Sequence, residues 1–372
     1  MDVQLSEEQV AIRDLAGRIL GEKLPPEVQR ALDDDPDWFA KDVWGELAKA
    51  DLLGLCLPES VGGGGYGMFE AALLCEQVGR AVAPVPFLAT VVLGAMAVAE
   101  HGTAAQQQEL LPAVIVGDLV LTAALVEGLG GLPPVVPATT ATADGDGWRL
   151  DGEKRFVPAG HLAGRILVPA ATGDGQSTMF LVDPTVAGVS IERNVATNLE
   201  PISTLTFDGV ALGAGAVLGA AGDGARITDW IVDRATAALC ATQAGVCEGA
   251  LRLTAKHTSE REQFGTKIAT FQAVAHRAAD AYIDTEAVRL TAYQAAWRLG
   301  EGLDAAEALA IAKWWAADGA QRVVHGAQHL HGGIGVDVDY PVHRYFRWAR
   351  QIELSLGGAS AHLRRLGQLI AG

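Results

Sequence analysis

The sequence predicts a mostly helical chain with a small antiparallel β-domain, a barrel or sandwich, in its middle. Residues 1–120 show helical periodicity, whereas residues 121–222 carry short β-type runs and repeated Asp-Gly turn dipeptides. Beyond that point no proline occurs before Pro341, and proline inside a helix costs about 3 kcal/mol. We therefore expect an N-terminal helical domain (1–120), a β-domain (121–222) and a C-terminal helical bundle (223–372).

Capping and apolar patterns place the first helices. Ser6, followed by Glu7 and Glu8, is a typical helix start ahead of an amphipathic run. The uncharged stretch 81–99 is nearly long enough to span a bilayer. Because two prolines lie near its start, it predicts a buried helix beginning near Leu88 instead.

Tight turns and short apolar runs define the expected β-domain. We expect strands at 165–168, 179–182 and 189–191. Hairpin turns are predicted at five dipeptides, namely Asp144-Gly145, Asp146-Gly147, Asp151-Gly152, Asp174-Gly175 and Asp208-Gly209.

Composition limits the possible partners and compartment. The formal net charge is −17 over 372 residues, which argues against nucleic acid or an anionic membrane as the main partner. The four cysteines form no Cys-x-x-Cys pair, so we expect neither a thiolate zinc site nor a redox dithiol. The acidic, polar start of the chain shows no signal peptide, and a cytoplasmic location is expected.

The segment Arg261–Gln272, REQFGTKIATFQ, carries the most chemistry. It combines a guanidinium, which can bind a phosphate through two parallel hydrogen bonds, with an aromatic ring and amide side chains. A structural turn needs only Gly265. The segment therefore predicts a nucleotide-type ligand; a surface ion pair of Arg261 with Glu260 or Glu262 is the alternative.

The order of helices, β-domain and helices, with REQFG in the first hairpin of the bundle, resembles the acyl-CoA dehydrogenase family. Further similar stretches are LSEEQVAIRDLAGRIL, LLGLCLPESVGGGGYG, LCEQVGRAVAPVPF, LDGEKRF, FDGVAL and QHLHGGIGVDVDYPVHRYFR. The resemblance implies FAD, an acyl-CoA thioester substrate and an electron-transfer flavoprotein as acceptor. In that family a carboxylate removes the α-proton while the flavin takes the β-hydride.

The resemblance implies that part of a FAD site is present. Arg261 would hold the pyrophosphate, and Phe264 and Gln272 would contact the dinucleotide. Gly332 and Gly333 would let the backbone approach the ADP closely, and His329 stands where the family usually has Gln. In the family these groups reach into the flavin site of a neighbouring subunit. For the two glycines, a plain helix-ending loop is the alternative.

The groups that would hold the flavin ring look eroded by the same resemblance. Val126 replaces a hydroxyl donor, Leu132 replaces a serine, and the segment after Gly-Glu-Lys leads to Phe156 and Pro158. Proline donates neither a hydroxyl nor a backbone hydrogen bond.

The catalytic base looks absent. The family position of the base falls on Leu356, which cannot accept a proton; in some members the base instead falls close to Ala235 here. Glu353 and Asp233 are the nearest acids, but their spacing favours ordinary ion pairs. A metal site built on His325 and His329 is not expected, because no acid completes it.

Three hypotheses follow. The chain resembles the base-lacking subunit of actinobacterial heterotetrameric acyl-CoA dehydrogenases that act on steroid side chains or other bulky acyl-CoAs, and it would complete a related subunit's FAD site. It could instead be a self-sufficient homotetramer with an atypical base. A flavin-free structural or acyl-CoA-binding protein is the third. The loss of several catalytic elements favours the first.

Overall fold

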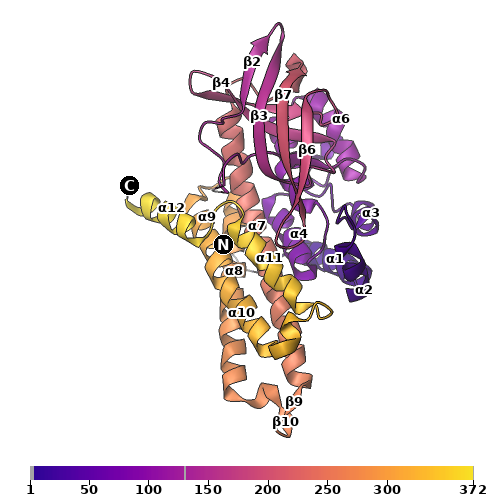
Figure 1. Ribbon diagram of the computed structural model, residues 1–372, viewed down its shortest axis with the longest axis vertical. Coiled ribbons are helices and arrows are strands. Elements are labelled where there is room, and N and C mark those ends of the chain that lie inside the picture. Colours follow the sequence, from indigo (N-terminus) through magenta and orange to yellow (C-terminus); the bar gives the residue numbers. More distant parts are fainter. Residues whose placement is uncertain (1–3, 130, 372) are drawn as a thin grey trace. The chain divides into compact units, whose positions relative to one another are not determined.

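The computed structural model describes residues 4–129 and 131–371 and confirms the mostly helical class with a central β-domain (Figure 1). The chain divides into two compact units. The first comprises the stretch up to residue 30, residues 68–83 and the chain from 236 onward; the second comprises residues 31–67 and 84–235. The three-domain division by residue number stays a prediction. Met1–Val3, on which the signal-peptide expectation partly rests, lie outside the described residues.

Long helices make up the first unit, and α2 and α7 also contribute residues to the second. The helices of this unit are α1 (Glu7–Lys23), α2 (Pro26–Asp33), α4 (Met68–Ala81), α7 (Gly224–Glu260), α8 (Gln272–Gly300), α9 (Ala306–Trp314), η5 (Trp315–Gly319), α10 (Ala320–His331), η6 (Gly332–Val336), α11 (Val342–Leu354) and α12 (Ala359–Ala371). A small hairpin of β9 (Glu262–Gln263) and β10 (Thr266–Lys267), followed by η4 (Ile268–Thr270), joins α7 to α8.

The predicted helix start at Ser6 is confirmed. Its Oγ accepts the backbone N–H of Gln9 at 3.2 Å, and the Gln9 side chain accepts the N–H of Ser6 at 3.0 Å. These reciprocal bonds satisfy two donors that a helix start otherwise leaves unpaired.

One sheet dominates the second unit. Its strands are β1 (Leu121–Ala123), β2 (Thr140–Asp144), β3 (Gly147–Pro158), β4 (Arg165–Gly173), β5 (Gln176–Val182), β6 (Val189–Val195), β7 (Pro201–Leu212) and β8 (Val217–Leu218). The order is β6-β7-β3-β2-β4-β5-β8, with β1 beside β4. Most pairs are antiparallel, but β1 and β2 pair with β4 in parallel. Among the described strands β6 and β8 do not pair, so the sheet is open and no barrel closes.

Short helices accompany this sheet within the second unit. They are α3 (Lys41–Lys49), η1 (Glu59–Val61), η2 (Leu88–Ala95), α5 (Met96–His101), α6 (Ala104–Ile115) and η3 (Ala214–Ala216). The apolar run does form a buried helix, which begins as a π-helix at Leu88 as predicted. Over the residues that the structure describes, no helix combines the length and apolar content that a bilayer crossing requires.

Two of the five Asp-Gly predictions were wrong. Asp144-Gly145 and Asp174-Gly175 lie in the β2–β3 and β4–β5 turns, and Asp146-Gly147 closes the first of these. Asp151-Gly152 and Asp208-Gly209 instead lie inside β3 and β7, at a bulge where Gly209 N donates to Asp151 Oδ1 at 2.7 Å. Gly152 and Gly209 have φ of +139° and +59°. A bulge uses the same left-handed backbone as a turn, so the dipeptide alone does not distinguish them.

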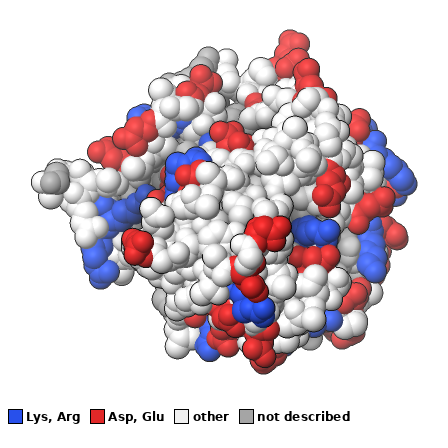
Figure 2. Space-filling model, turned by 90° about the horizontal axis from the view of Figure 1, so that it is seen from above, with Lys and Arg blue, Asp and Glu red and all other residues white. Residues whose placement is uncertain are grey.

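Acidic and basic side chains are interspersed over the face of the molecule drawn in Figure 2.

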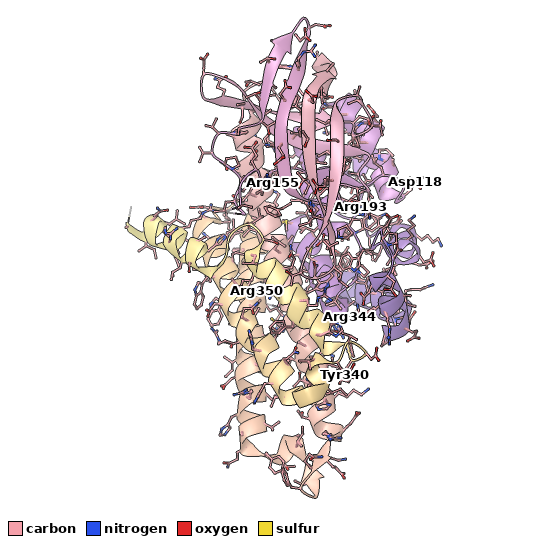
Figure 3. All side chains as sticks on the ribbon, viewed as in Figure 1. Asp118, Arg155, Arg193, Tyr340, Arg344 and Arg350 are labelled. Carbon is pink, nitrogen blue, oxygen red and sulfur yellow. The ribbon has the colours of Figure 1, made fainter. Side chains whose placement is uncertain are left out.

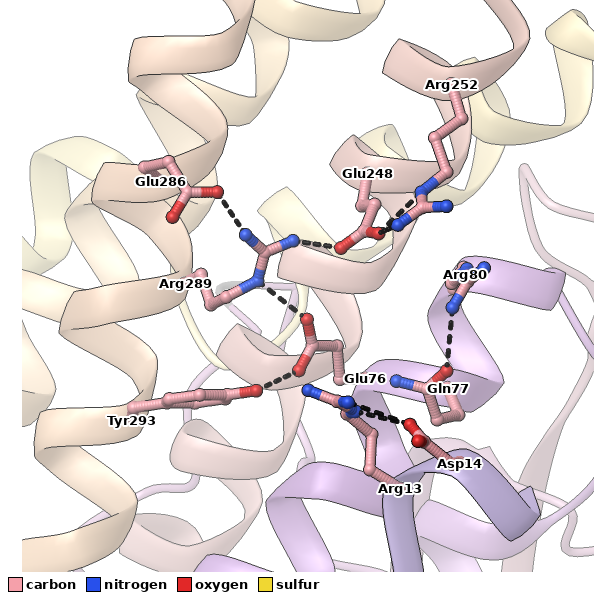
Figure 4. A network of polar contacts seen from close by, with 10 residues as sticks. All are labelled: Arg13, Asp14, Glu76, Gln77, Arg80, Glu248, Arg252, Glu286, Arg289 and Tyr293. Atoms are coloured by element: carbon pink, nitrogen blue, oxygen red, sulfur yellow. Dashed lines mark hydrogen bonds and ion pairs between the residues drawn. The ribbon is translucent and has the colours of Figure 1, made fainter. Parts of the chain in front are cut away.

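A buried ionic network joins three helices of the first unit (Figure 4). Glu76 on α4 is 2% exposed, and its Oε1 accepts Arg289 Nε of α8 at 2.8 Å. Tyr293 donates to the other oxygen of Glu76, and Arg289 also pairs with Glu248 of α7 and with Glu286. Burial opposes the charge on Arg289, but Glu76 and the other carboxylates outweigh it and raise the pKa of Arg289.

Close backbone contact between α4 and α7 lets this network form. A Cβ on Gly79 would lie 1.9 Å from the Thr242 carbonyl oxygen, and one on Gly245 would lie 1.8 Å from that of Glu76. Glycine is therefore required at both positions, because any side chain would push the helices apart.

Removing the guanidinium should destabilise the helical unit. Arg289→Met leaves Glu76 buried with only Tyr293 as partner, and we expect a loss of about 3 kcal/mol in the free energy of unfolding, measured by urea denaturation. Arg252→Met is the matched control, because Arg252 pairs with Glu248 but its side chain is 65% exposed; its loss should stay below about 1 kcal/mol. Equal losses would contradict a special role for the buried pair.

Candidate functional site

The loop between α7 and α8 presents its side chains outward. Arg261 N donates to the His257 carbonyl, and Ile268 N donates to the Arg261 carbonyl, each at 2.9 Å. These bonds close the β9–β10 hairpin directly onto the end of α7. Because Gln263 pairs with Thr266, Phe264 and Gly265 are the two central residues of the turn.

The backbone of Phe264 is held in an unfavourable conformation. Its φ is +54° and that of Gly265 is +80°, the pattern of a type I′ turn, in which Asn-Gly is the usual pair. A left-handed backbone costs a non-glycine residue roughly 1–2 kcal/mol. Phe264 is nevertheless 94% exposed, and among the described residues its ring makes one aromatic contact, edge-on to Phe271 at 6.3 Å between ring centroids. The fold of this chain does not account for an aromatic residue here.

Arg261 is exposed, and its acidic neighbour Glu262 is engaged elsewhere. Glu262 pairs with Lys267 at 2.7 Å, and Lys267 also donates to the Glu260 carbonyl. Across residues 4–129 and 131–371, no ion pair to Arg261 forms. The alternative of a surface pair with Glu260 or Glu262 is therefore not realised in this structure, and the guanidinium remains able to bind an anion.

The end of α10 supplies the second predicted segment. Gly332 ends this helix with φ of +61°, which favours glycine. Gly333 has no such backbone reason, and a Cβ on either glycine would meet no atom of the described chain within 4 Å. Both are exposed. Space beside the backbone is what close approach of an outside group requires.

A stack of aromatic rings brings these two segments together. His257, one turn before Arg261, stacks on His331, one residue before Gly332, at 4.4 Å between ring centroids. Tyr340, at the approach to α11, lies edge-on to the His257 ring and tilted against the His331 ring (Figure 3). His331 is buried and bonded through Nδ1 to the Ala327 carbonyl at 2.7 Å. Burial lowers the pKa of both histidines, so the stack is uncharged at neutral pH.

Gln272 and His329 complete the predicted set. Gln272 is exposed at the first position of α8. His329 on α10 is exposed, and its Nδ1 is bonded to Arg277 Nη1 of α8 at 2.5 Å. The structure thus places all six residues of the predicted half-site on the α7–α8 hairpin, the start of α8 and the end of α10. Sequence reasoning missed the contacts of His257, His331 and Arg277, which cross from one helix to another.

Leu356 occupies a tightly held turn after α11. Its φ is +51°, and its carbonyl is bonded to His362 Nε2 at 2.8 Å. The ammonium of Lys313, itself fully buried, donates to the carbonyls of Ile352, Glu353 and Gly357 at 3.1, 3.0 and 2.9 Å. The turn is thus fixed by hydrogen bonds, while the side chain that it displays cannot transfer a proton.

The nearest acids have other surroundings. Glu353 forms an ion pair with Arg350 at 2.6 Å. Asp233 is half-buried on α7, in the part of that helix that belongs to the other unit. Its charge acts on its neighbour Arg234.

In the β-domain, Glu127 holds together the loop that the resemblance assigns to the flavin ring. Its carboxylate accepts Lys154 Nζ at 2.6 Å and the backbone N–H groups of Ala138 and Thr139 at 2.6 and 3.0 Å. Lys154 is fully buried. The carboxylate is therefore committed to the closure of this loop.

No donor side chain stands at the eroded positions of that loop. The side chain of Val126 has no polar atom, and its carbonyl accepts Arg155 N at 2.7 Å. The Pro158 carbonyl accepts Thr122 Oγ1, also at 2.7 Å. Leu132 and Phe156 are 46% and 44% exposed, so neither is sealed into a core. These residues do not fit the hydrogen-bonding edge of a flavin.

The histidines do not gather as metal ligands. His325 packs edge-on to Phe346, His329 is bonded to Arg277, and His331 is stacked on His257. Within the described ranges no group of three or more His, Cys, Asp or Glu is arranged to hold a metal ion.

The helical fold with a central sheet and an exposed, arginine-bearing hairpin defines the class of protein, and comparison with known proteins gives the family. Models of the acyl-CoA dehydrogenase N-terminal, middle and C-terminal domains match residues 6–118, 122–210 and 222–369. The chain belongs to the acyl-CoA dehydrogenase family. Its activity class is that of this family of flavin-dependent oxidoreductases, and its cofactor is FAD.

Close relatives cover the whole chain. The acyl-CoA dehydrogenase FadE27 of Mycobacterium tuberculosis is 38% identical, covering 100% of this chain and 99% of its own. The solved structure of a variant of the Tcur3481-Tcur3483 steroid ACAD is similar at 46% identity, with a TM-score of 0.90 and 98% of each chain covered. The ChsE4-ChsE5 complex from Mycobacterium tuberculosis is similar at 38% identity and a TM-score of 0.93, covering 100% of this chain and 99% of that one.

Acidification should loosen the Leu356 turn through His362. Burial lowers the pKa of His362 from 6.5 to about 4. Between pH 6.5 and pH 4 the unfolded chain binds a proton at His362 that the folded chain does not. The free energy of unfolding is therefore highest above pH 6.5 and falls by roughly 2–3 kcal/mol as the pH approaches 4. His362→Gln keeps a donor for the Leu356 carbonyl but cannot titrate. We expect urea denaturation at pH 7 and 4.5 to show a smaller loss in the variant; an identical loss would refute the assignment.

Proposed function

We propose that this chain is a subunit of a heteromeric acyl-CoA dehydrogenase that completes the FAD site of a related subunit and lacks a catalytic base of its own. The related subunit would hold the flavin ring and the base. The assembly would remove two hydrogens across the α,β-bond of an acyl-CoA thioester.

The observation that carries this proposal is Phe264. A phenylalanine at φ +54° with 94% of its surface exposed costs backbone energy and buries nothing in this chain. Strain of this kind persists where a function requires it. A surface that arrives from outside the chain, such as a dinucleotide held by another subunit, supplies the missing contact.

The role of the half-site follows from its exposed groups. Arg261 would bind the pyrophosphate through charge-assisted hydrogen bonds, and Phe264 would lie against the dinucleotide. Gln272 and His329 would donate hydrogen bonds, and Gly332 and Gly333 would admit the ADP close to the backbone. FAD, when bound, supplies a flavin ring that accepts a hydride.

The residues at the expected positions of the catalytic base and the flavin-binding groups support a partner that has its own catalytic groups. Leu356 stands where a base is expected; His362 is bonded to its carbonyl, and Lys313 donates to the carbonyl of the next residue, Gly357. Val126, Leu132 and Pro158 provide no side-chain donor for the flavin. A turn kept in place while its reactive group is missing is consistent with a subunit retained for assembly.

The relatives support the heteromer and the substrate class. One similar structure is described as a complex of two named chains, ChsE4 and ChsE5, and another as a steroid ACAD. We therefore infer a bulky acyl-CoA, such as a steroid side chain, as the substrate. An electron-transfer flavoprotein would be the acceptor. The four cysteines are buried and none of them forms a disulfide, which supports a location in the reducing cytoplasm.

Purification of the chain alone and with its partner tests the proposal. The partner would be a related acyl-CoA dehydrogenase subunit that is co-expressed with it. We expect the isolated chain to be colourless and the co-purified complex to be yellow. A stoichiometric flavin in the isolated chain that bleaches with an acyl-CoA would support a self-sufficient homotetramer instead. A colourless chain that forms no flavin-containing complex would support the flavin-free alternative.

Arg261→Ala should weaken FAD binding in that complex. Loss of a charge-assisted pair removes about 1.5–3 kcal/mol, so the dissociation constant, measured by flavin fluorescence, should rise roughly ten- to hundredfold. Arg252→Ala is the matched control, because this exposed arginine on the same helix pairs with Glu248 within the chain. Unchanged FAD affinity in Arg261→Ala would show that the half-site assignment is wrong.

A further inference from the structure

The contact between Arg277 and His329 determines which ring nitrogen of the histidine carries the proton. Arg277 Nη1 lies 2.5 Å from His329 Nδ1. A guanidinium has five N–H donors and no acceptor. Nδ1 must therefore accept, and in the neutral imidazole the proton resides on Nε2.

Arg277 has few competing partners. Throughout the described parts of the chain it makes no ion pair with a carboxylate. Its Cγ lies 3.7 Å from where a Cβ on Gly326 would stand, so its stem crosses α10 three residues before His329. This packing directs the guanidinium toward the histidine and leaves the opposite edge of the exposed ring available.

We infer that Arg277 is a positioning residue that fixes His329 as an Nε2–H donor toward the dinucleotide of the neighbouring subunit. The inference rests on the proposed half-site. Without Arg277 the tautomer is no longer fixed, and a fraction of the molecules would turn an acceptor toward the ligand, because the two tautomers of a neutral histidine reverse the roles of its nitrogens. Both side chains are exposed, so the contact contributes little to folding and its effect falls on binding.

The tautomer can be measured on the isolated chain, independently of FAD. Two-bond ¹⁵N–¹H correlation spectra of histidine-labelled protein at pH 8 report which nitrogen is protonated, and His329→Gln assigns the signal. We expect the Nε2–H form in the wild type, a mixture of tautomers in Arg277→Ala, and retention of the Nε2–H form in Arg277→Lys, which keeps a cationic donor. An Nδ1–H form in the wild type, or an unchanged spectrum in Arg277→Ala, would overturn the inference.

A double-mutant cycle in the FAD-containing complex tests the consequence. Arg277→Ala should raise the FAD dissociation constant about twofold or more, because only the fraction of molecules whose His329 ring presents Nε2–H then binds with full affinity, and it should add nothing in a His329→Ala background. An equal loss in both backgrounds would mean that Arg277 binds the cofactor itself and would overturn the positioning role. If His329→Ala leaves FAD binding unchanged while Arg261→Ala weakens it, the inference fails and the proposed function stands. If neither His329→Ala nor Arg261→Ala weakens FAD binding, the proposed function fails.

Discussion

Glu76 lies almost completely buried on α4, with its two carboxylate oxygens bound to Arg289 and Tyr293 of α8. The same arginine reaches Glu248 on α7, so one cation links three helices. A charge at this depth is tolerated only when it is paired and hydrogen-bonded, and its pairing fixes how α4, α7 and α8 lie against one another. Gly79 and Gly245 allow the approach that this pairing needs.

The half-site depends on this frame, because its residues sit at helix ends and in the hairpin between α7 and α8. The stack of His257 on His331 then joins the end of α7 to the end of α10. Functional groups held on rigid elements keep their geometry better than groups on free loops. The exposed Arg261 and Phe264 are consequently presented by a fixed support and are poised for a surface outside the chain.

Local patterns in the sequence predicted much of the fold. The cap at Ser6 and the helix start at Leu88 depend on a few neighbouring residues, and both were read correctly. Asp151-Gly152 and Asp208-Gly209 were misread, because the dipeptide reports a left-handed backbone and not whether the chain reverses there. The open strand order, with β1 and β2 parallel to β4, depends on long-range pairing that no local pattern contains.

The candidate site divides in the same way. Arg261, Phe264, Gln272, His329, Gly332 and Gly333 could be proposed from motifs, because each lies in a short, recognisable segment. The contacts that hold these residues in place could not be predicted from motifs. These supports are pairs on different helices, separated by 52 to 213 residues in the chain: Glu76 with Arg289, His257 with His331, and Arg277 with His329. Such pairs become visible only when the helices are assembled.

The ratio of FAD to protein in the co-purified complex tests the central claim most directly. It is obtained from flavin absorbance after release of the cofactor, together with the amount of each chain. A subunit that lends its half-site to a partner and lacks a flavin cradle of its own predicts one FAD for each pair of unlike chains. One FAD for every chain, or FAD retained by this chain when its partner is removed, would contradict the account.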